Sequence, residues 1–154
     1  MTIANVLSLP ATSLHDTRRE GVKLGVIVAT VIWCWIAVVD AVVGQPFHTF
    51  TMLGGVLAFT VVHYALNVTY AIVLLSAIHG AERTPSLIIG LLFWLITFQG
   101  GFAMFTNLLA EARLGPEAWI AIFGGNIIGL VTAFVLLSRK HPLASYVKRA
   151  EDEN

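Results

Sequence analysis

The sequence predicts an all-α protein: a bundle of four transmembrane helices that run up, down, up and down, with both chain ends on the cytoplasmic side. Three observations support this prediction. Only 12% of the 154 residues are charged and 57% are hydrophobic, whereas a soluble domain carries about 25% charged residues. Four predominantly apolar stretches are long enough to cross a bilayer. The connections between them are short, so consecutive helices are expected to be antiparallel neighbours.

The first predicted span covers residues 21–43 and follows residues 1–17, which are expected to be a weakly ordered leader or an interfacial segment. Glycine at 44 followed by Gln45-Pro46 ends the span, because glycine suits the position after a helix and proline cannot continue one. One face carries small residues of the kind that permit close helix packing, and an acid near its end. This face consists of Gly21, Gly25, Ala29, Trp33, Ala37 and Asp40.

The second predicted span covers residues 51–79 and belongs to a stretch that has no charged residue from Thr49 to Ile78. Threonine at 49 or 51 can cap its start, and glycine at 80 closes it. Four residues with hydrogen-bonding side chains share one helical face: Thr60, His63, Asn67 and Tyr70. Such a stripe is costly inside a membrane unless it meets partners on other helices.

The third predicted span covers residues 85–110 and the fourth covers residues 117–138. Each begins after a proline-containing turn, and Thr84 before Pro85 is a typical helix start. The polar and small face of the third span consists of Gln99, Ala103, Thr106, Asn107 and Glu111. The fourth span has a second small-residue surface, made of Gly124, Gly125 and Gly129 beside Asn126. Residues 18–141 thus form the bundle, and residues 142–154 form a charged cytoplasmic tail.

The orientation follows from the basic residues, which favour the cytoplasmic side of a membrane. One side of the predicted bundle holds Arg18, Arg19, Lys23, Arg83, Arg139, Lys140, Lys148 and Arg149, and the other holds Arg113. Both chain ends are therefore expected to be cytoplasmic, and the loops 45–50 and 111–117 are expected to face outward. A multi-pass protein of a bacterial inner membrane fits this distribution.

Composition and motifs also exclude several classes of function. The basic residues flank predicted spans and form no separate patch, so nucleic acid is not an expected partner. The single cysteine, Cys34, excludes a disulfide within the chain. The sequence contains neither a GxSxG nor a HExxH motif, so a non-enzymatic role is preferred.

A layer of polar residues is predicted near the middle of the membrane. His63 lies about 18 Å below the outer end of its helix, at a rise of about 1.5 Å per residue. Residues at similar depths, or on the same helical face, complete the predicted layer: Asn67, Tyr70, Gln99 and Asn126. Asp40, nearer the outer surface, is also counted in this polar core. The core could bind a small molecule, a proton or an ion, with Asp40 and His63 as its titrating members. The alternative is a set of interhelical hydrogen bonds that fixes the packing of the helices.

A second group of candidates lies toward the outer face and could form a metal site or a proton entrance. It consists of His48, Asp40 and Glu111, with Glu117 nearby, and it offers the imidazole and carboxylate ligands that metal ions use. The alternative is structural, because Glu117 suits the first turn of a helix and Asp40 could pair with Arg113.

Haem b was considered because two histidines can hold it between membrane helices. His63 has no second histidine at its depth, and His79 lies about 24 Å away along the same helix. A haem would therefore need His63 from two subunits, or the interfacial pair of His79 and His141, which are otherwise expected to have no special role.

The segment Trp35–Asp40, followed by Gly44-Gln45-Pro46-Phe47-His48-Thr49 and by His63, resembles a group of uncharacterised small bacterial four-helix membrane proteins. The resemblance covers the first two spans. It implies a setting in the bacterial inner membrane and does not imply an activity.

These observations predict a small, non-enzymatic membrane protein that acts as a channel or carrier, or as a membrane subunit of a larger complex, through its midplane polar layer. One alternative is a redox protein that binds haem or a metal ion, and another is a purely structural subunit. The expected partners are the lipid bilayer and other membrane subunits or further copies of this chain, because the small-residue surfaces exceed what one bundle needs.

Overall fold

The computed structural model describes residues 14–81, 90, 93 and 116–141, and these residues contain helices and no strands. The helices are α1 (Leu14–Val42), α2 (His48–Met52), α3 (Val56–Ala81) and α5 (Pro116–Ser138). Three of them, over Asp16–Val42, Val56–Gly80 and Glu117–Ser138, are long and apolar enough to cross a membrane. They coincide with the first, second and fourth predicted spans. The third predicted span lies outside the described residues except for Gly90 and Phe93, which are helical.

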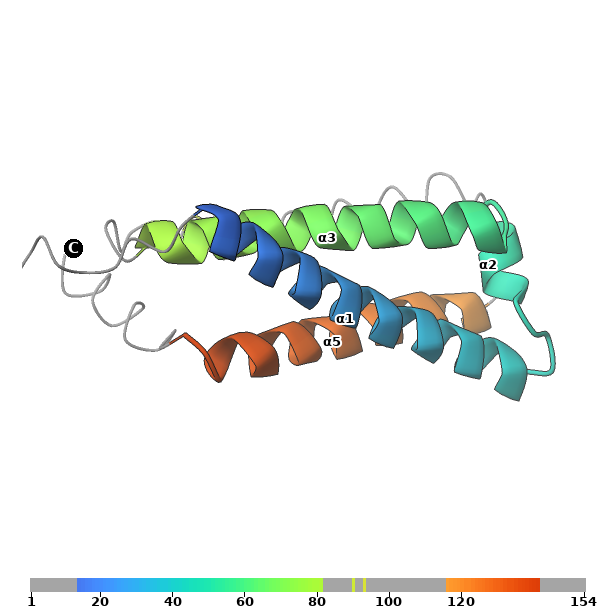
Figure 1. The fold of residues 1–154 in the computed structure, drawn as a ribbon. Helices are drawn as coiled ribbons and strands as arrows, with labels where there is room; N and C mark the ends of the chain where they lie inside the picture. Colours follow the sequence, from blue (N-terminus) through green and yellow to red (C-terminus); the bar gives the residue numbers. More distant parts are fainter. Residues whose placement is uncertain (1–13, 82–89, 91–92, 94–115, 142–154) are drawn as a thin grey trace, which may run out of the picture.

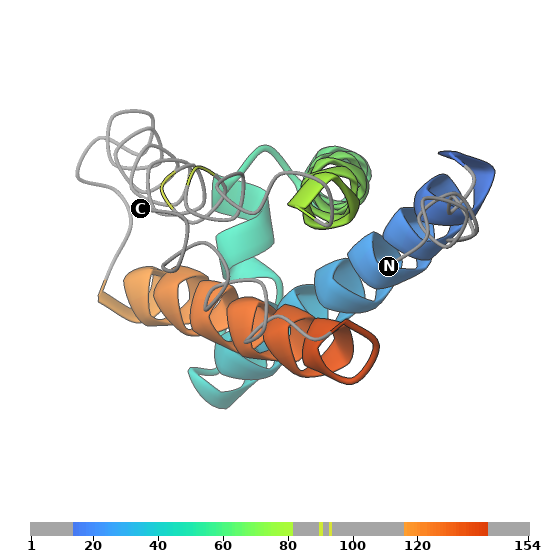
Figure 2. The same cartoon turned by 90° about the vertical axis from the view of Figure 1, so that its left-hand side faces the viewer.

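Helix α1 is the central element of the described fold, because α3 and α5 both pack along it. α3 returns antiparallel to α1, and α5 runs in the same direction as α3 (Figure 1). Viewed from the end, α1 runs obliquely past α3 and crosses α5 (Figure 2). One core cluster of buried residues joins all three helices and includes Leu24, Leu75 and Leu137. A second cluster, around Ile36, Phe50 and Ala121, closes the end of the bundle that carries α2.

The first helix begins earlier than the predicted span. It starts at Leu14 rather than near residue 21, so the end of the predicted leader is helical. Asp16 lies in its first turn, where a negative charge interacts favourably with the partial positive charge of the helix N-terminus. Thr17 is buried, which shows that this first turn packs against the rest of the bundle.

The connection between α1 and α3 is longer and more structured than the predicted turn. Gly44 has a φ of 78° and Phe47 has a φ of 63°, and the short helix α2 follows directly. Gly54 and Gly55, with φ values of 103° and 94°, then separate α2 from α3. Because a positive φ is readily adopted only by glycine, this pair ends α2, and α3 starts at Val56 instead of residue 51. The two threonines considered as caps of the second span therefore lie in α2.

The small residues of α1 bring its backbone close to that of α3. A Cβ atom added at Gly25 would lie 2.5 Å from the Cα atom of Val68 and 2.8 Å from the carbonyl oxygen of Asn67. At Gly21 the added Cβ would lie 2.8 Å from the Cα atom of Ile72. Ala29, further along the same face, is fully buried. This confirms that the predicted small-residue face of the first span is a helix-packing surface.

The small residues of α5 contact α1 through side chains rather than through backbone. An added Cβ at Gly124 would lie 2.8 Å from Nε1 of Trp35, and one at Gly129 would lie 2.5 Å from Cδ1 of Ile32. The small-residue surfaces of the first and fourth predicted spans are thus used inside the chain. They leave the predicted self-association dependent on other surfaces, such as the polar and small face of the third predicted span, which lies outside the described residues.

Candidate functional site

His63 connects the middle of α3 to α1. Its Nε2 atom lies 3.1 Å from the carbonyl oxygen of Ala29, a distance that fits a hydrogen bond donated by the imidazole. The imidazole ring stacks on Phe59, with centroids 5.0 Å apart and planes 14° apart. His63 therefore faces α1, as the predicted polar face requires, and its partner is a backbone carbonyl.

Asn67 belongs to the same cluster and bonds within its own helix. Its Nδ2 atom donates to the carbonyl oxygen of His63 at 2.9 Å and lies 3.3 Å from Nδ1 of His63. Because both imidazole nitrogens have polar neighbours, the pair satisfies much of its own hydrogen-bonding capacity. Such an arrangement favours the structural alternative for these two residues.

The other members of the predicted midplane layer do not join this pair in the described part of the chain. Tyr70 is half-buried and packs against the core cluster at the opposite end from α2. Asn126 lies on α5, half-buried, and its side chain makes no hydrogen bond to a described residue. Gln99 lies outside the described residues. A single polar layer that spans all helices stays a prediction.

Further polar contacts between α1 and α3 were not anticipated from the sequence. Trp33 donates from Nε1 to Oγ1 of Thr60 at 3.0 Å, and the hydroxyl groups of Thr30 and Tyr64 lie 2.9 Å apart. Thr60 was placed on the polar face of its helix, but its partner was not identified. With His63, these contacts form a ladder of hydrogen bonds along the α1–α3 interface, and such bonds fix the register of packed helices.

Asp40 organises the corner that follows α1. Its Oδ2 atom accepts a hydrogen bond from the backbone N–H of Thr49 at 2.8 Å, and its Oδ1 atom accepts one from the Thr49 hydroxyl at 2.6 Å. Both residues are buried, with 4% and 1% of their surface exposed. The carboxylate thus satisfies backbone and side-chain donors in the first turn of α2, as a helix-capping side chain does.

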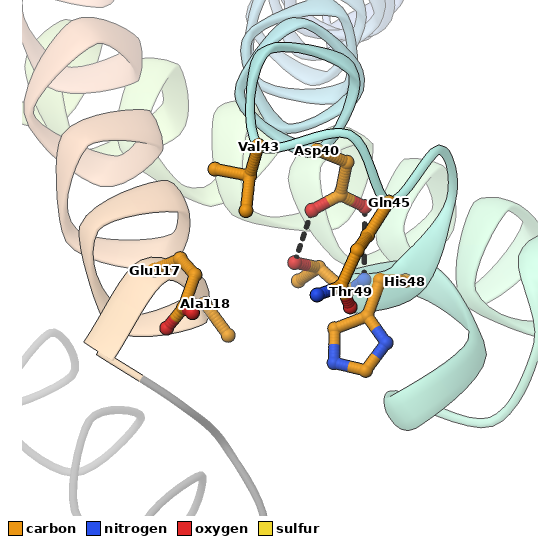
Figure 3. Close-up of a pocket in the computed structure, with 7 residues that line it drawn as sticks. All are labelled: Asp40, Val43, Gln45, His48, Thr49, Glu117 and Ala118. Carbon is orange, nitrogen blue, oxygen red and sulfur yellow. Dashed lines mark hydrogen bonds between the residues drawn. The ribbon is translucent and has the colours of Figure 1, made fainter.

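A pocket of about 190 Å³ opens beside this corner. Figure 3 shows Asp40 at its top, with Gln45 and His48 on one side and Glu117 of α5 across from them. Its other lining residues are Val43, Thr49 and Ala118. His48 is half-buried and Glu117 is exposed, so the pocket is open to the surroundings. We refer to it as the corner pocket.

The corner pocket brings together most of the predicted outer site. Asp40, His48 and Glu117 all line it, whereas Glu111 lies outside the described residues. Within the described ranges, however, the only group of three or more ligating side chains close enough to share an ion lies elsewhere. In addition, both oxygens of Asp40 already accept hydrogen bonds. The pocket therefore suits a hydrated or organic cation better than a metal ion bound directly by three side chains.

Thr49 and Gln45 line the pocket and were not predicted as site residues. The signal that could have identified Thr49 is its position in α2, nine residues after Asp40 and directly after a glycine- and proline-containing turn that reverses the chain. A buried acid before such a turn needs donors, and backbone N–H groups at a following helix start are the usual source.

Comparisons of the chain with family models, with curated proteins and with solved structures found no match. The resemblance of the first two spans to small bacterial membrane proteins stays a prediction.

Proposed function

We propose that the chain is a small, non-enzymatic membrane protein of the channel or carrier type that takes up a small cation at the corner pocket. The observation that carries this proposal is the convergence of two carboxylates and one imidazole, from α1, α2 and α5, on one open pocket. Asp40 is held in place by two hydrogen bonds from Thr49. Glu117, across the pocket, is the group that can move to meet a ligand.

The size and charge of the pocket define the class of ligand. A cavity needs about 10–15 Å³ to hold one water molecule, so a pocket of about 190 Å³ has room for a hydrated ion or a small organic ammonium ion. Two carboxylates attract a cation, and the low polarity around a buried carboxylate strengthens this attraction. Gln45 and His48 add groups that can bind the water molecules around an ion or the ion itself.

The ladder of hydrogen bonds between α1 and α3 supplies polar groups below the pocket. Trp33–Thr60 and His63–Ala29 follow along the same interface. In a protein that spans the membrane, such groups are expensive to leave unpaired and often mark ion or proton paths. Because these groups bond one another or the backbone, they hold α1 against α3 beneath the pocket, and we limit the proposed cation site to the corner pocket.

The test is cation binding and flux with the full chain in proteoliposomes. Binding of Na⁺, K⁺, Mg²⁺ and tetramethylammonium is measured by calorimetry, and flux is followed with ion-sensitive dyes. We expect saturable binding of at least one of these cations, and weaker binding and slower flux in Glu117→Gln. Asp16→Asn, which removes a carboxylate at the other end of α1, is the matched control. Absence of binding by all four cations, or unchanged binding in Glu117→Gln, would contradict the proposal.

A membrane subunit of a larger complex is the second candidate function. It is favoured by the outer face of α5, where Ile120, Phe123, Ile127, Leu130 and Phe134 are all more than half exposed. Crosslinking in native membranes, followed by analysis of the mass of the products, distinguishes a complex from a protein that has only lipid around it.

A further inference from the structure

Three residues from distant parts of the sequence meet at the end of the bundle opposite α2. Glu20 belongs to the start of α1, His79 to the end of α3, and His141 directly follows α5. Their potential ligand atoms all lie within 4.8 Å of one another. Among the described residues, no other such group is present. Two of the ligating side chains thus come from α1 and α3, and the third comes from the segment that follows α5, which ends at Ser138.

His141 has a buried ring nitrogen that makes no hydrogen bond within the described part of the chain. Its Nε2 atom is buried and has no hydrogen-bond partner among the described residues, and Oε1 of Glu20 lies 3.6 Å away, beyond the distance of a hydrogen bond. An unpaired buried nitrogen costs free energy. A bound ion between His141 and Glu20 would remove this cost.

His79 is held in place by a neighbour in α1. Its Nδ1 atom lies 2.9 Å from Oγ1 of Thr17, and Thr17 is buried. When Nδ1 donates this hydrogen bond, Nε2 keeps its lone pair for a metal ion. Histidine ligands in metal sites are commonly oriented through such a hydrogen bond from the second ring nitrogen.

We infer that Glu20, His79 and His141 form a binding site for a divalent transition-metal ion of the Zn²⁺ type. Two imidazoles and one carboxylate are a common set of zinc ligands, and they leave a fourth position for water. Bonds of about 2.0–2.1 Å in a tetrahedral site place ligand atoms about 3.4 Å apart. The ligand atoms now lie within 4.8 Å of one another, so small side-chain rotations would bring them to this distance. The two imidazole rings lie in contact, with centroids 5.2 Å apart, which leaves no room for a porphyrin between them.

Lys140 is the group that competes with the ion. Its Nζ atom lies 3.0 Å from Oε1 of Glu20, and its side chain is 66% exposed. An exposed ion pair contributes little to stability, so the ammonium group can move into solvent when a metal ion binds Glu20. The site is distinct from the corner pocket, which lies at the other end of the bundle, and it does not depend on the function proposed for that pocket.

The test uses the purified full chain in detergent, treated with a chelator and then titrated with Zn²⁺ by calorimetry. Co²⁺ is the spectroscopic probe, because its d–d absorption reports the coordination geometry. The variants are His79→Ala, His141→Ala, Thr17→Val and Lys140→Gln, and Thr132→Val is the control, because Thr132 lies on α5 outside both proposed sites and bonds the carbonyl oxygen of Ile128. Circular dichroism and size-exclusion chromatography establish that each variant is folded.

We expect one Zn²⁺ per chain, loss of this binding in His79→Ala and in His141→Ala, and wild-type binding in Thr132→Val. Thr17→Val should weaken binding by about 10- to 100-fold, as loss of an orienting hydrogen bond does in other metal sites. Lys140→Gln should tighten binding, because it removes a competing positive charge; a purely structural cluster would not show this gain.

Three results would overturn the inference: no stoichiometric Zn²⁺ binding by the wild-type chain, retained binding in both histidine variants, or weaker binding in Lys140→Gln. If His79→Ala does not fold, His141→Ala and Lys140→Gln still decide the question, because both residues follow the last turn of α5.

Discussion

Nε2 of His63 lies 3.1 Å from the carbonyl oxygen of Ala29, and this contact joins the middle of α3 to the middle of α1. His63→Leu removes it and also removes the Nδ1 neighbour of Asn67. We expect the free energy of unfolding in detergent to fall by about 0.6 kcal/mol and by no more than about 1.7 kcal/mol, the range of hydrogen bonds between membrane helices. The measurement is a reversible denaturation titration followed by circular dichroism.

The control for this prediction is His48→Leu, since the side chain of His48 makes no hydrogen bond to the described residues. Its effect on unfolding should be smaller than that of His63→Leu. Equal stability of His63→Leu and the wild-type chain would mean that the His63–Ala29 contact contributes nothing to the packing of α1 against α3.

The close approach of α1 and α3 at Gly25 gives a stronger prediction. In Gly25→Ala, the new Cβ would lie 2.5 Å from the Cα atom of Val68, so the two backbones must separate. We expect the free energy of unfolding to fall by about 1–3 kcal/mol, the usual cost of overpacking a core. At Gly90 an added Cβ meets no heavy atom within 4 Å, so Gly90→Ala is the matched control.

Thermal unfolding in the same detergent measures both glycine variants. Gly25→Ala should unfold at a clearly lower temperature than the wild-type chain, and Gly90→Ala should unfold near the wild-type temperature. If both variants had the same stability, the described contact between α1 and α3 would be wrong.

The sequence predicted the three long helices that the structure describes, and the small-residue faces of α1 and α5, because both depend on local patterns. Apolar length identifies a membrane span, and the spacing of Gly21, Gly25 and Ala29 identifies a face that permits close approach. The same reasoning placed His63 and Asn67 on the side of their helix that meets another helix. It could not identify the carbonyl of Ala29 as the partner, because backbone groups carry no sequence signature.

Two features of the candidate sites could not be predicted from the sequence because they depend on the way distant segments meet. Asp40 and Thr49 meet only because a glycine-containing corner turns the chain back and forms α2. Glu20, His79 and His141 lie at the ends of three different helices, and the exact lengths of these helices determine whether they meet. Helix ends are the least predictable part of a helix.

The buried contact between Asp40 and Thr49 predicts a coupled loss of stability. Asp40→Asn keeps one acceptor oxygen and loses the other, and Thr49→Val removes the hydroxyl donor. The free energy of unfolding of each single variant should fall by about 1.5–3 kcal/mol, the contribution of a hydrogen bond to a charged group. The double variant should lose less than the sum of the two, because both changes remove the same bond between Oγ1 and Oδ1.

A double-mutant cycle from denaturation titrations measures this coupling, with Thr49→Ser as the variant that keeps the hydroxyl and should keep most of the stability. Additive losses in the double variant would show that Asp40 and Thr49 stabilise the corner independently of each other.

The hydrogen bond from Trp33 to Thr60 tests whether the ladder between α1 and α3 extends toward α2. Trp33→Phe removes the Nε1 donor, which lies 3.0 Å from Oγ1 of Thr60, while keeping an aromatic ring against Phe50, whose centroid is 5.0 Å from that of Trp33. Thr60→Val removes the acceptor. The coupling free energy between the two changes should be about 0.6 kcal/mol.

Trp33→Phe combined with Thr30→Val is the control pair, because Thr30 bonds Tyr64 instead, and its coupling should be near zero. A coupling as large in the control pair as in the Trp33–Thr60 pair would mean that the indole contributes through packing rather than through its N–H group.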